Sequence, residues 1–132
     1  MKAKLNIVLS IFILTIISIS IISCKKTDDE KPVITLSTPV SEQDYAIGDT
    51  IFISGHVSDN EALHELEIRL TKEETGETPF TFTPTVHDLA SYHIDTFYIP
   101  SDTVHIHYHL KIEAWDHDNN EAELEYTLHW ND

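Results

Sequence analysis

The chain has very few cysteines, since Cys24 is the only one in 132 residues. A disulfide within the chain is therefore excluded, and the fold must be held by burial of apolar side chains, or by burial together with a bound metal. The sequence also contains no Gly-x-Ser-x-Gly motif, which would indicate a serine nucleophile, and no second cysteine that could act as one. We therefore expect no enzymatic activity.

Basic residues are scarce as well. Eight Lys and Arg residues stand against 23 Asp and Glu residues, which gives a formal net charge of −15. A surface this acidic repels nucleic acid and anionic lipid headgroups. We expect no nucleic-acid partner.

Long apolar runs are absent after residue 22, and the one such run lies at the N-terminus. It extends over residues 5–22, follows two lysines, and ends at Ser23-Cys24. A charged start, an apolar segment and a small residue before a cysteine are typical of a bacterial lipoprotein signal peptide. We expect residues 1–23 to be this signal and Cys24 to be lipidated. The run is also long enough to span a bilayer, so an uncleaved anchor is the alternative.

Residues 24–31 have no apolar side chain after the cysteine and are interpreted as a disordered, charged tether. Pro32 marks its end, and residues 32–132 are expected to form one domain. Several acyl chains on one cysteine hold a protein stably to a membrane, so the domain is expected to be tethered outside the cytoplasm.

Glycine is rare, with three residues, and no segment shows a sustained 3.6-residue apolar period. Short β-rich segments separated by turn residues recur instead, which predicts an all-β protein. About seven strands fit an immunoglobulin-like antiparallel β-sandwich in which the strand at 104–115 lies between those at 63–71 and 121–130. The expected strands cover residues 33–38, 49–57, 63–71, 79–84, 92–99, 104–115 and 121–130. Residues 58–61 are expected to form a loop, and Gly55 to mark a bulge.

Two stretches carry a resemblance to known proteins. Asp59-Asn60-Glu61-Ala62-Leu63, together with the segment 109–123, resembles motifs of bacterial Ig-like, cadherin-like modules. With the N-terminal signal and the His-rich strand, the chain resembles a family of Bacteroidota lipoproteins known as a domain of unknown function (number 4625). The resemblance implies a sandwich fold, an envelope location and no established activity. Asn119 stands where such modules usually have Gly, but Asn tolerates the left-handed conformation, so the turn is expected to persist.

The segment 26–30 of the tether resembles the signal that directs Bacteroidota lipoproteins to the cell surface. This resemblance implies display on the outside of the outer membrane, with the periplasmic face as the alternative.

Histidines form the first candidate site. His105, His107 and His109 alternate along one predicted strand, so all three project from one face at a spacing of about 6.5–7 Å. The neighbouring antiparallel strand places His129 opposite either His107 or His109, depending on the register. Neutral imidazoles bind Zn or Cu, and Glu65 or Glu67 is expected to add or orient a ligand. The sequence thus predicts capture of a transition metal or haem, and the alternative is a solvated polar face.

Acidic residues form the second candidate site. Two predicted loops share one end of such a sandwich and together offer the hard oxygen ligands that Ca²⁺ requires. The candidate residues are Asp59, Glu61, Asp116, Asp118 and Asn120. Ordinary turn chemistry explains Asp and Asn at these positions equally well.

Both tryptophans, Trp115 and Trp130, are expected to pack in the core or at its rim. The predicted function is therefore a lipid-anchored envelope binding module that captures a metal or a metal-containing ligand. The alternative is a structural, adhesion or protein-interaction module, rigidified by Ca²⁺ or not, whose partner is another envelope protein.

Overall fold

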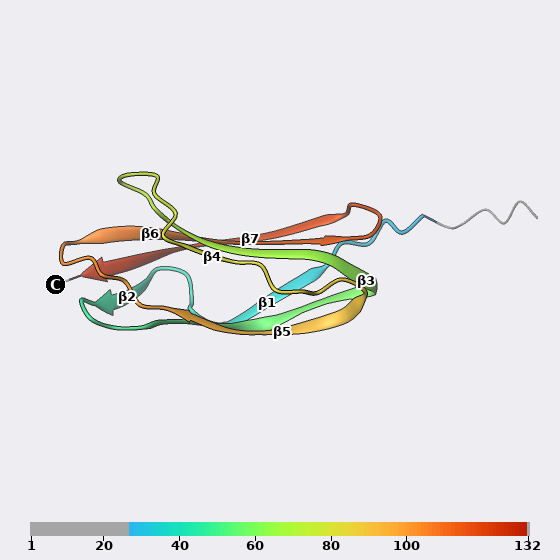
Figure 1. The fold of residues 1–132 in the computed structure, drawn as a ribbon, viewed down its shortest axis with the longest axis horizontal. Coiled ribbons are helices and arrows are strands. Elements are labelled where there is room, and N and C mark those ends of the chain that lie inside the picture. Colours follow the sequence, from blue (N-terminus) through green and yellow to red (C-terminus); the bar gives the residue numbers. More distant parts are fainter. Residues whose placement is uncertain (1–26, 132) are drawn as a thin grey trace, which may run out of the picture.

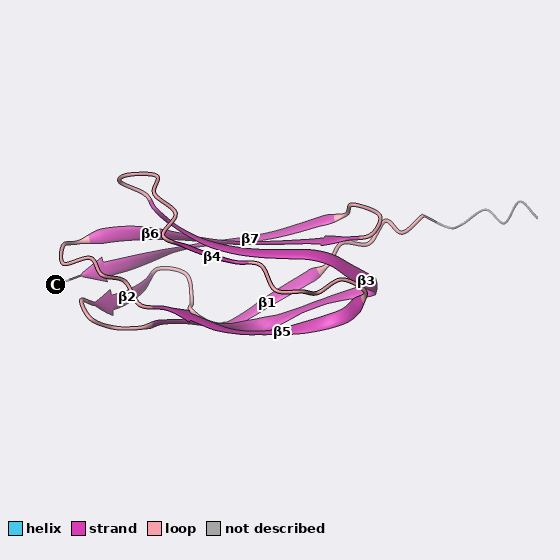
Figure 2. Cartoon of the chain, in the orientation of Figure 1, coloured by secondary structure: helices cyan, strands magenta, loops and turns pink. Residues whose placement is uncertain are grey.

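The computed structural model describes residues 27–131, so the predicted signal peptide and Cys24 lie outside the described residues. Residues 27–131 form seven strands, and no helix among them is long and apolar enough to cross a membrane (Figures 1 and 2). The strands are β1 (Val33–Thr38), β2 (Gln43–Ala46), β3 (Ile51–Lys72), β4 (Phe80–Phe82), β5 (Leu89–Tyr98), β6 (Ile106–Asp116) and β7 (Glu121–Asn131).

The strands form two layers that are joined by the long strand β3. The first half of β3 pairs with β1 and β5, and its second half pairs with β6 and β4. β6 continues to β7, and β7 pairs with β2. One layer therefore has the order β1-β3-β5 and the other β4-β3-β6-β7-β2 (Figure 1). This confirms an immunoglobulin-like β-sandwich with β6 between β3 and β7, although β2 and β7 are parallel.

The core lies between the layers and follows from the alternation of apolar side chains along each strand. Ile51, Ile53 and Val57 of β3 point inward from one layer, and the later part of β3 and β6 contribute inward residues from the other. Burying each large aliphatic side chain contributes about 1.5–3 kcal/mol. The fully buried residues of the second layer include Leu66, Ile68, Leu70, Tyr108, Leu110 and Ile112.

Trp130 lies fully buried in this core, as predicted. Its Nε1 donates to the carbonyl oxygen of Asp102 at 3.1 Å. The carboxylate of Asp102 accepts from the Tyr108 hydroxyl and from Lys72 Nζ, the latter at 2.9 Å. The polar atoms of a buried Trp and Tyr thus share one partner. Trp115 is half-buried near the end of β6.

The predicted loop at residues 58–61 is wrong, because the chain stays extended there and β3 turns from one layer into the other. Ser58 still pairs with both neighbours in the first layer, and Leu63 already pairs with Asp116 in the second. Polar composition favours a loop, but backbone pairing on both sides of the bend overrides it. The short strand β2 was not predicted, since Tyr45 is its only buried side chain.

Gly55 marks an irregularity, as expected, and the additional residue lies in its partner β1. The β1–β3 register shifts between Leu36 and Thr38, opposite Gly55. A Cβ at position 55 would lie 2.4 Å from the carbonyl oxygen of Thr35, so only glycine permits this approach. Asn119 has a φ of 65°, which confirms the left-handed turn predicted for it.

Candidate metal centres

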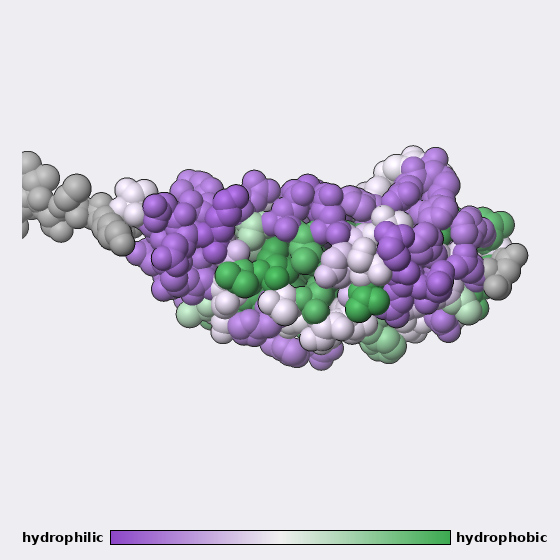
Figure 3. Space-filling model, turned by 180° about the vertical axis from the view of Figure 1, so that it is seen from behind, coloured by the Kyte–Doolittle hydropathy of each residue, from purple (hydrophilic) through white to green (hydrophobic). Residues whose placement is uncertain are grey.

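One end of the sandwich gathers most of the candidate ligands. It is formed by the tether residues 27–31, the bend of β3, the β4–β5 loop and the β6–β7 turn, and we call it the tether end (Figure 1). Hydrophilic residues cover the end next to the tether on the face drawn in Figure 3, whereas hydrophobic residues gather in the middle of the molecule. The surface at the tether end is therefore suited to polar or ionic ligands.

Three carboxylates converge at the tether end. One oxygen of each of Asp28, Asp59 and Asp116 lies within 4.8 Å of the other two, and all three side chains are buried. Asp59 and Asp116 were predicted as calcium ligands. Asp28 was not, because its segment was interpreted as disordered; that interpretation is wrong for this residue, which hydrogen bonds to the domain.

Hydrogen bonds from backbone amides that follow in the chain account for one oxygen of Asp59 and one oxygen of Asp116. Asp59 Oδ1 accepts from the backbone amides of Glu61 and Ala62 at 3.0 and 2.9 Å. Asp116 Oδ1 accepts from the amides of Asp118 and Asn120, both at 2.8 Å. The second carboxylate oxygens of Asp59 and Asp116 have different surroundings.

Asp116 Oδ2 accepts from Asn120 Nδ2 at 2.6 Å. Asp59 Oδ2 is buried and has no hydrogen-bond partner among the described residues. Ordinary turn chemistry therefore explains only part of the cluster, because a buried carboxylate oxygen is normally satisfied.

Two of the other predicted calcium residues, Asp118 and Asn120, bond to the tether. Asp118 Oδ2 accepts from the amide of Asp28 at 2.8 Å, and Asn120 Nδ2 donates to its carbonyl oxygen at 3.0 Å. Asn60 Nδ2 donates to Asp28 Oδ1 at 3.1 Å. Glu61 is exposed and contributes only its backbone amide to Asp59.

The predicted histidine face is present at the opposite end of the sandwich. The β6–β7 register places His107 opposite His129, and their ring centroids lie 5.1 Å apart. His105 Nε2 lies 3.3 Å from His107 Nε2. We call His105, His107 and His129 the hairpin patch. His109 instead lies opposite Thr127, where its Nε2 is 3.5 Å from Glu125.

The carboxylates beside the hairpin patch are not the predicted ones. Glu74 Oε1 accepts from the backbone amide of His107, which lowers the pKa of Glu74, and lies 2.9 Å from His107 Nδ1. Glu42 Oε2 lies 2.8 Å from His129 Nε2. The prediction for Glu65 and Glu67 is wrong, because the β3–β6 register sets them opposite residues 115 and 113, far along β6 from position 107.

A second group of histidines, which the sequence analysis missed, lies at the tether end. His64, His87 and His117 each offer a ring nitrogen within 4.8 Å of the other two. They come from β3, the β4–β5 loop and the β6–β7 turn, and no periodicity links such distant positions. The high histidine content, nine residues, is the only signal in the sequence that points to them.

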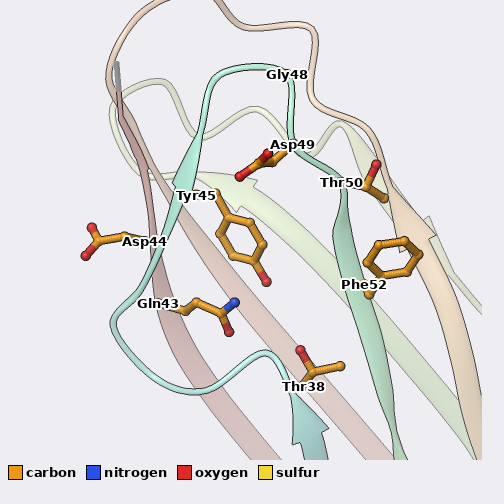
Figure 4. Close-up of a pocket in the computed structure, with 8 residues that line it drawn as sticks. All are labelled: Thr38, Gln43, Asp44, Tyr45, Gly48, Asp49, Thr50 and Phe52. Carbon is orange, nitrogen blue, oxygen red and sulfur yellow. The ribbon is translucent and has the colours of Figure 1, made fainter.

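A pocket of about 480 Å³ lies between β2 and the start of β3. Figure 4 shows the ring of Tyr45 pointing from β2 toward the strands that carry Thr38 and Phe52, whereas Asp44 points away. Asp49 Oδ2 accepts from the amide of Ala46 at 2.9 Å. The eight lining residues include no histidine or cysteine, so the pocket adds no metal ligands of these types.

Comparison with known proteins identifies the family of the chain. No curated protein matches the chain. Among solved structures, the chain is similar to one described as fibronectin(III)-like modules of Clostridium thermocellum CbhA, with 16% identity, a TM-score of 0.49, and coverage of 75% of this chain and 96% of the other. The profile of the family described as "Domain of unknown function (DUF4625)" matches residues 22–130, and the chain therefore belongs to that family.

Proposed function

We propose that this chain is a lipid-anchored, non-catalytic sandwich module of the bacterial envelope that serves as a structural or protein-interaction domain. In this proposal, Ca²⁺ at the tether end holds the domain in a fixed orientation to its anchor. One observation carries the proposal: carboxylates from the tether, from the β3 bend and from the end of β6 converge on one point. These are Asp28, Asp59 and Asp116.

A cation explains the chemistry of this cluster. Two like unit charges about 4 Å apart repel by about 4 kcal/mol at an effective dielectric constant of about 20. A divalent ion between them turns this repulsion into attraction. It also gives a partner to Asp59 Oδ2, whose burial without a hydrogen bond costs about 1–3 kcal/mol. Ca²⁺ fits best, because it accepts carboxylate and carbonyl oxygens in flexible geometry.

The consequence for the anchored protein is a short free linker. Cys24 and Asp28 are four residues apart, so a lipid on Cys24 would lie within about 15 Å of the cluster even along a fully extended chain. A module fixed this close to the membrane presents its opposite end, with the hairpin patch, away from the anchor (Figure 1). That geometry suits a domain that displays a surface to a partner.

The calcium proposal is tested on the full chain in detergent, by melting in Ca²⁺ and in chelator. A free Ca²⁺ concentration of about 100 times the dissociation constant stabilises the folded state by about 2.7 kcal/mol, so the melting temperature rises in Ca²⁺. Asp59→Asn keeps an oxygen for the two backbone amides and removes the buried negative charge, and we expect it to abolish the rise. Glu61→Gln, at an exposed position in the same bend, is the control. Equal melting in both conditions, or a rise retained in Asp59→Asn, contradicts calcium binding.

The anchor is tested separately in bacterial cells that express the full chain and receive labelled palmitate. We expect label on the wild-type protein, recovery in the outer-membrane fraction, and loss of the label in Cys24→Ser. Unlabelled wild-type protein contradicts the lipid anchor. Label retained in Cys24→Ser contradicts this site of attachment.

A second candidate function is capture of a transition metal by the hairpin patch. The observation that favours it is the contact of His107 with both His105 and His129. Titration of the full chain with Cu²⁺, Zn²⁺ and haem tests it. We expect one binding site per chain to be lost in a His107→Ala and His129→Ala double variant and to be retained in His109→Ala, and an unchanged number of sites in the double variant contradicts this role.

A further inference from the structure

Three exposed imidazoles meet at the tether end from distant parts of the chain. The ring centroids of His64 and His87 are 5.1 Å apart, those of His64 and His117 are 5.0 Å apart, and those of His87 and His117 are 4.7 Å apart. One nitrogen of each ring lies within 4.8 Å of the others. Three ligands of a tetrahedral Zn²⁺ at about 2.0–2.1 Å lie about 3.4 Å from one another. Small rotations of exposed side chains are therefore enough to close the site.

The backbone holds these three segments together at Leu63. This residue pairs with Asp116 of β6 and with Leu89 of β5, and its carbonyl oxygen accepts from the amide of Asp88 at 3.0 Å. His64 directly follows Leu63, and His117 directly follows Asp116. His87 directly precedes Asp88. The positions of the histidine Cα atoms are thus set by strand pairing and not by contacts between the rings.

A bulge directs the first of the rings. In the β3–β6 ladder Leu63 faces Asp116 and Glu65 faces Trp115, so His64 is the additional residue with no partner in β6. A bulge bends its strand and re-aims the side chain of the additional residue, and bulges are frequent beside functional sites. Without it, the side chain of residue 64 would follow the strict alternation of β3.

Asp88 contacts two of the three rings. Its Oδ1 lies 2.9 Å from His117 Nε2, and its Oδ2 lies 3.2 Å from His87 Nδ1. The residue has a φ of 66° in a turn closed by the Leu89 amide, which donates to the carbonyl oxygen of Val86 at 3.0 Å. A carboxylate that accepts one ring N–H leaves the other ring nitrogen as an electron-pair donor, which is the usual second contact of a metal-bound histidine.

We propose that His64, His87 and His117 form a transition-metal site for Zn²⁺ or a similar borderline divalent cation, and that Asp88 is its positioning residue. Imidazole nitrogens select such ions over Ca²⁺ and Mg²⁺, which prefer oxygen. Three protein nitrogens leave one tetrahedral position for water or for a ligand supplied from outside. This site is separate from the carboxylate cluster and from the hairpin patch, and it goes beyond the function proposed above.

A histidine pair on the outer face of the β1-β3-β5 layer provides a matched control. His56 and His93 are both exposed and lie opposite each other in the β3–β5 ladder. Neither belongs to a group of three potential ligands within the described residues. A His56→Gln and His93→Gln double variant therefore removes two neighbouring surface histidines and leaves the proposed site intact.

The test is calorimetric titration of the full chain in detergent with Zn²⁺, accompanied by Co²⁺ absorption as a report of tetrahedral nitrogen coordination. We expect one tight site that weakens at least about 100-fold in His64→Gln and in His117→Gln and is unchanged in the His56→Gln and His93→Gln control. Melting in chelator shows whether each variant folds. Loss of the site only when His107 and His129 are replaced, equal weakening in the control, or no saturable binding overturns the proposal.

The role of Asp88 has its own readout. Asp88→Asn keeps a residue that tolerates the left-handed turn, so the fold is expected to persist. We expect Zn²⁺ affinity to fall about 10–100-fold and the ring-nitrogen NMR signals of His87 and His117 in the metal-free protein to shift from single tautomers to mixtures. Unchanged tautomers with unchanged affinity overturn the positioning role.

Discussion

The backbone amide of Asp28 donates to Asp118 Oδ2 at 2.8 Å, across 90 residues of sequence. The Asn120 side chain holds the carbonyl of the same residue, so both main-chain polar groups of Asp28 are bonded to the β6–β7 turn. These two hydrogen bonds attach the tether to the domain.

This attachment predicts a local effect of Asp118→Ala. A hydrogen bond to a carboxylate contributes about 1.5 kcal/mol or more, so in chelator the amide of Asp28 is expected to exchange at least about tenfold faster with solvent. Hydrogen exchange measured by NMR checks this, and the amides of β3 and β6 serve as internal references. Asp29→Ala, at an exposed neighbouring position, is expected to change nothing. Exchange at Asp28 that is as fast in the wild type as in Asp118→Ala would refute the attachment.

A second prediction concerns Asp102, whose carbonyl oxygen accepts from Trp130. Asp102→Asn removes the charge that Tyr108 and Lys72 share, and we expect it to lower the free energy of unfolding by about 2 kcal/mol at neutral pH. Urea unfolding followed by Trp fluorescence measures the change. Asp95→Asn, at an exposed position of β5, is the control and is expected to have no effect.

The same carboxylate predicts a pH dependence. The hydrogen bond from Tyr108 and the ion pair with Lys72 lower the pKa of Asp102. Its stabilising contribution is therefore complete above the unfolded-state value of about 3.9 and is lost as the pH falls through the lower folded value. The difference in unfolding free energy between wild type and Asp102→Asn should be constant near neutral pH and shrink below about pH 4. A difference that grows on acidification would contradict the assignment.

Gly55→Ala is expected to destabilise the fold by about 1–3 kcal/mol, because the new methyl group meets a backbone carbonyl and not a movable side chain. Gly76→Asn is the comparison, since position 76 has a φ of 72° and no atom within 4 Å of an added Cβ. Asn adopts this conformation, so a smaller loss is expected there. Equal urea midpoints for the two variants would show that β1 can retreat from β3 at no cost.

The left-handed turn at Asn119 predicts opposite behaviour of two substitutions. Asn119→Gly should leave the unfolding free energy within about 0.5 kcal/mol of the wild type. Asn119→Val should lower it by about 1–2 kcal/mol, because a β-branched residue is strained at a φ of 65°. Thermal unfolding in chelator distinguishes them, and equal stability of the two variants would speak against a strained turn.

Strand alternation predicted most of the fold, because its period is a local property of the chain. The parity rule for antiparallel neighbours limited the partner of His129 to His107 or His109, and the structure shows that it is His107. Hydrophobic patterning does not reveal backbone pairing in polar segments, and so it missed β2 and the extended bend of β3.

The sequence analysis missed Asp28 and the three histidines of the tether end for one physical reason. Asp28 lies in a segment whose composition is that of a disordered chain, and it is ordered by contacts with residues far along the sequence. His64 is re-aimed by a bulge, and His87 and His117 lie in turns. Long-range pairing brings these residues together, and no pattern in a single sequence specifies which turns will meet.

The tether and the C-terminus leave the sandwich at opposite ends of its long axis (Figure 1). In the proposed function, a pulling force between the anchor and a partner at the far end acts parallel to the strands. Such a force loads all the hydrogen bonds between β1 and β3 in shear at the same moment, instead of opening them one after another. The antiparallel pairing of these two strands is a geometry that resists extension along the long axis of the sandwich.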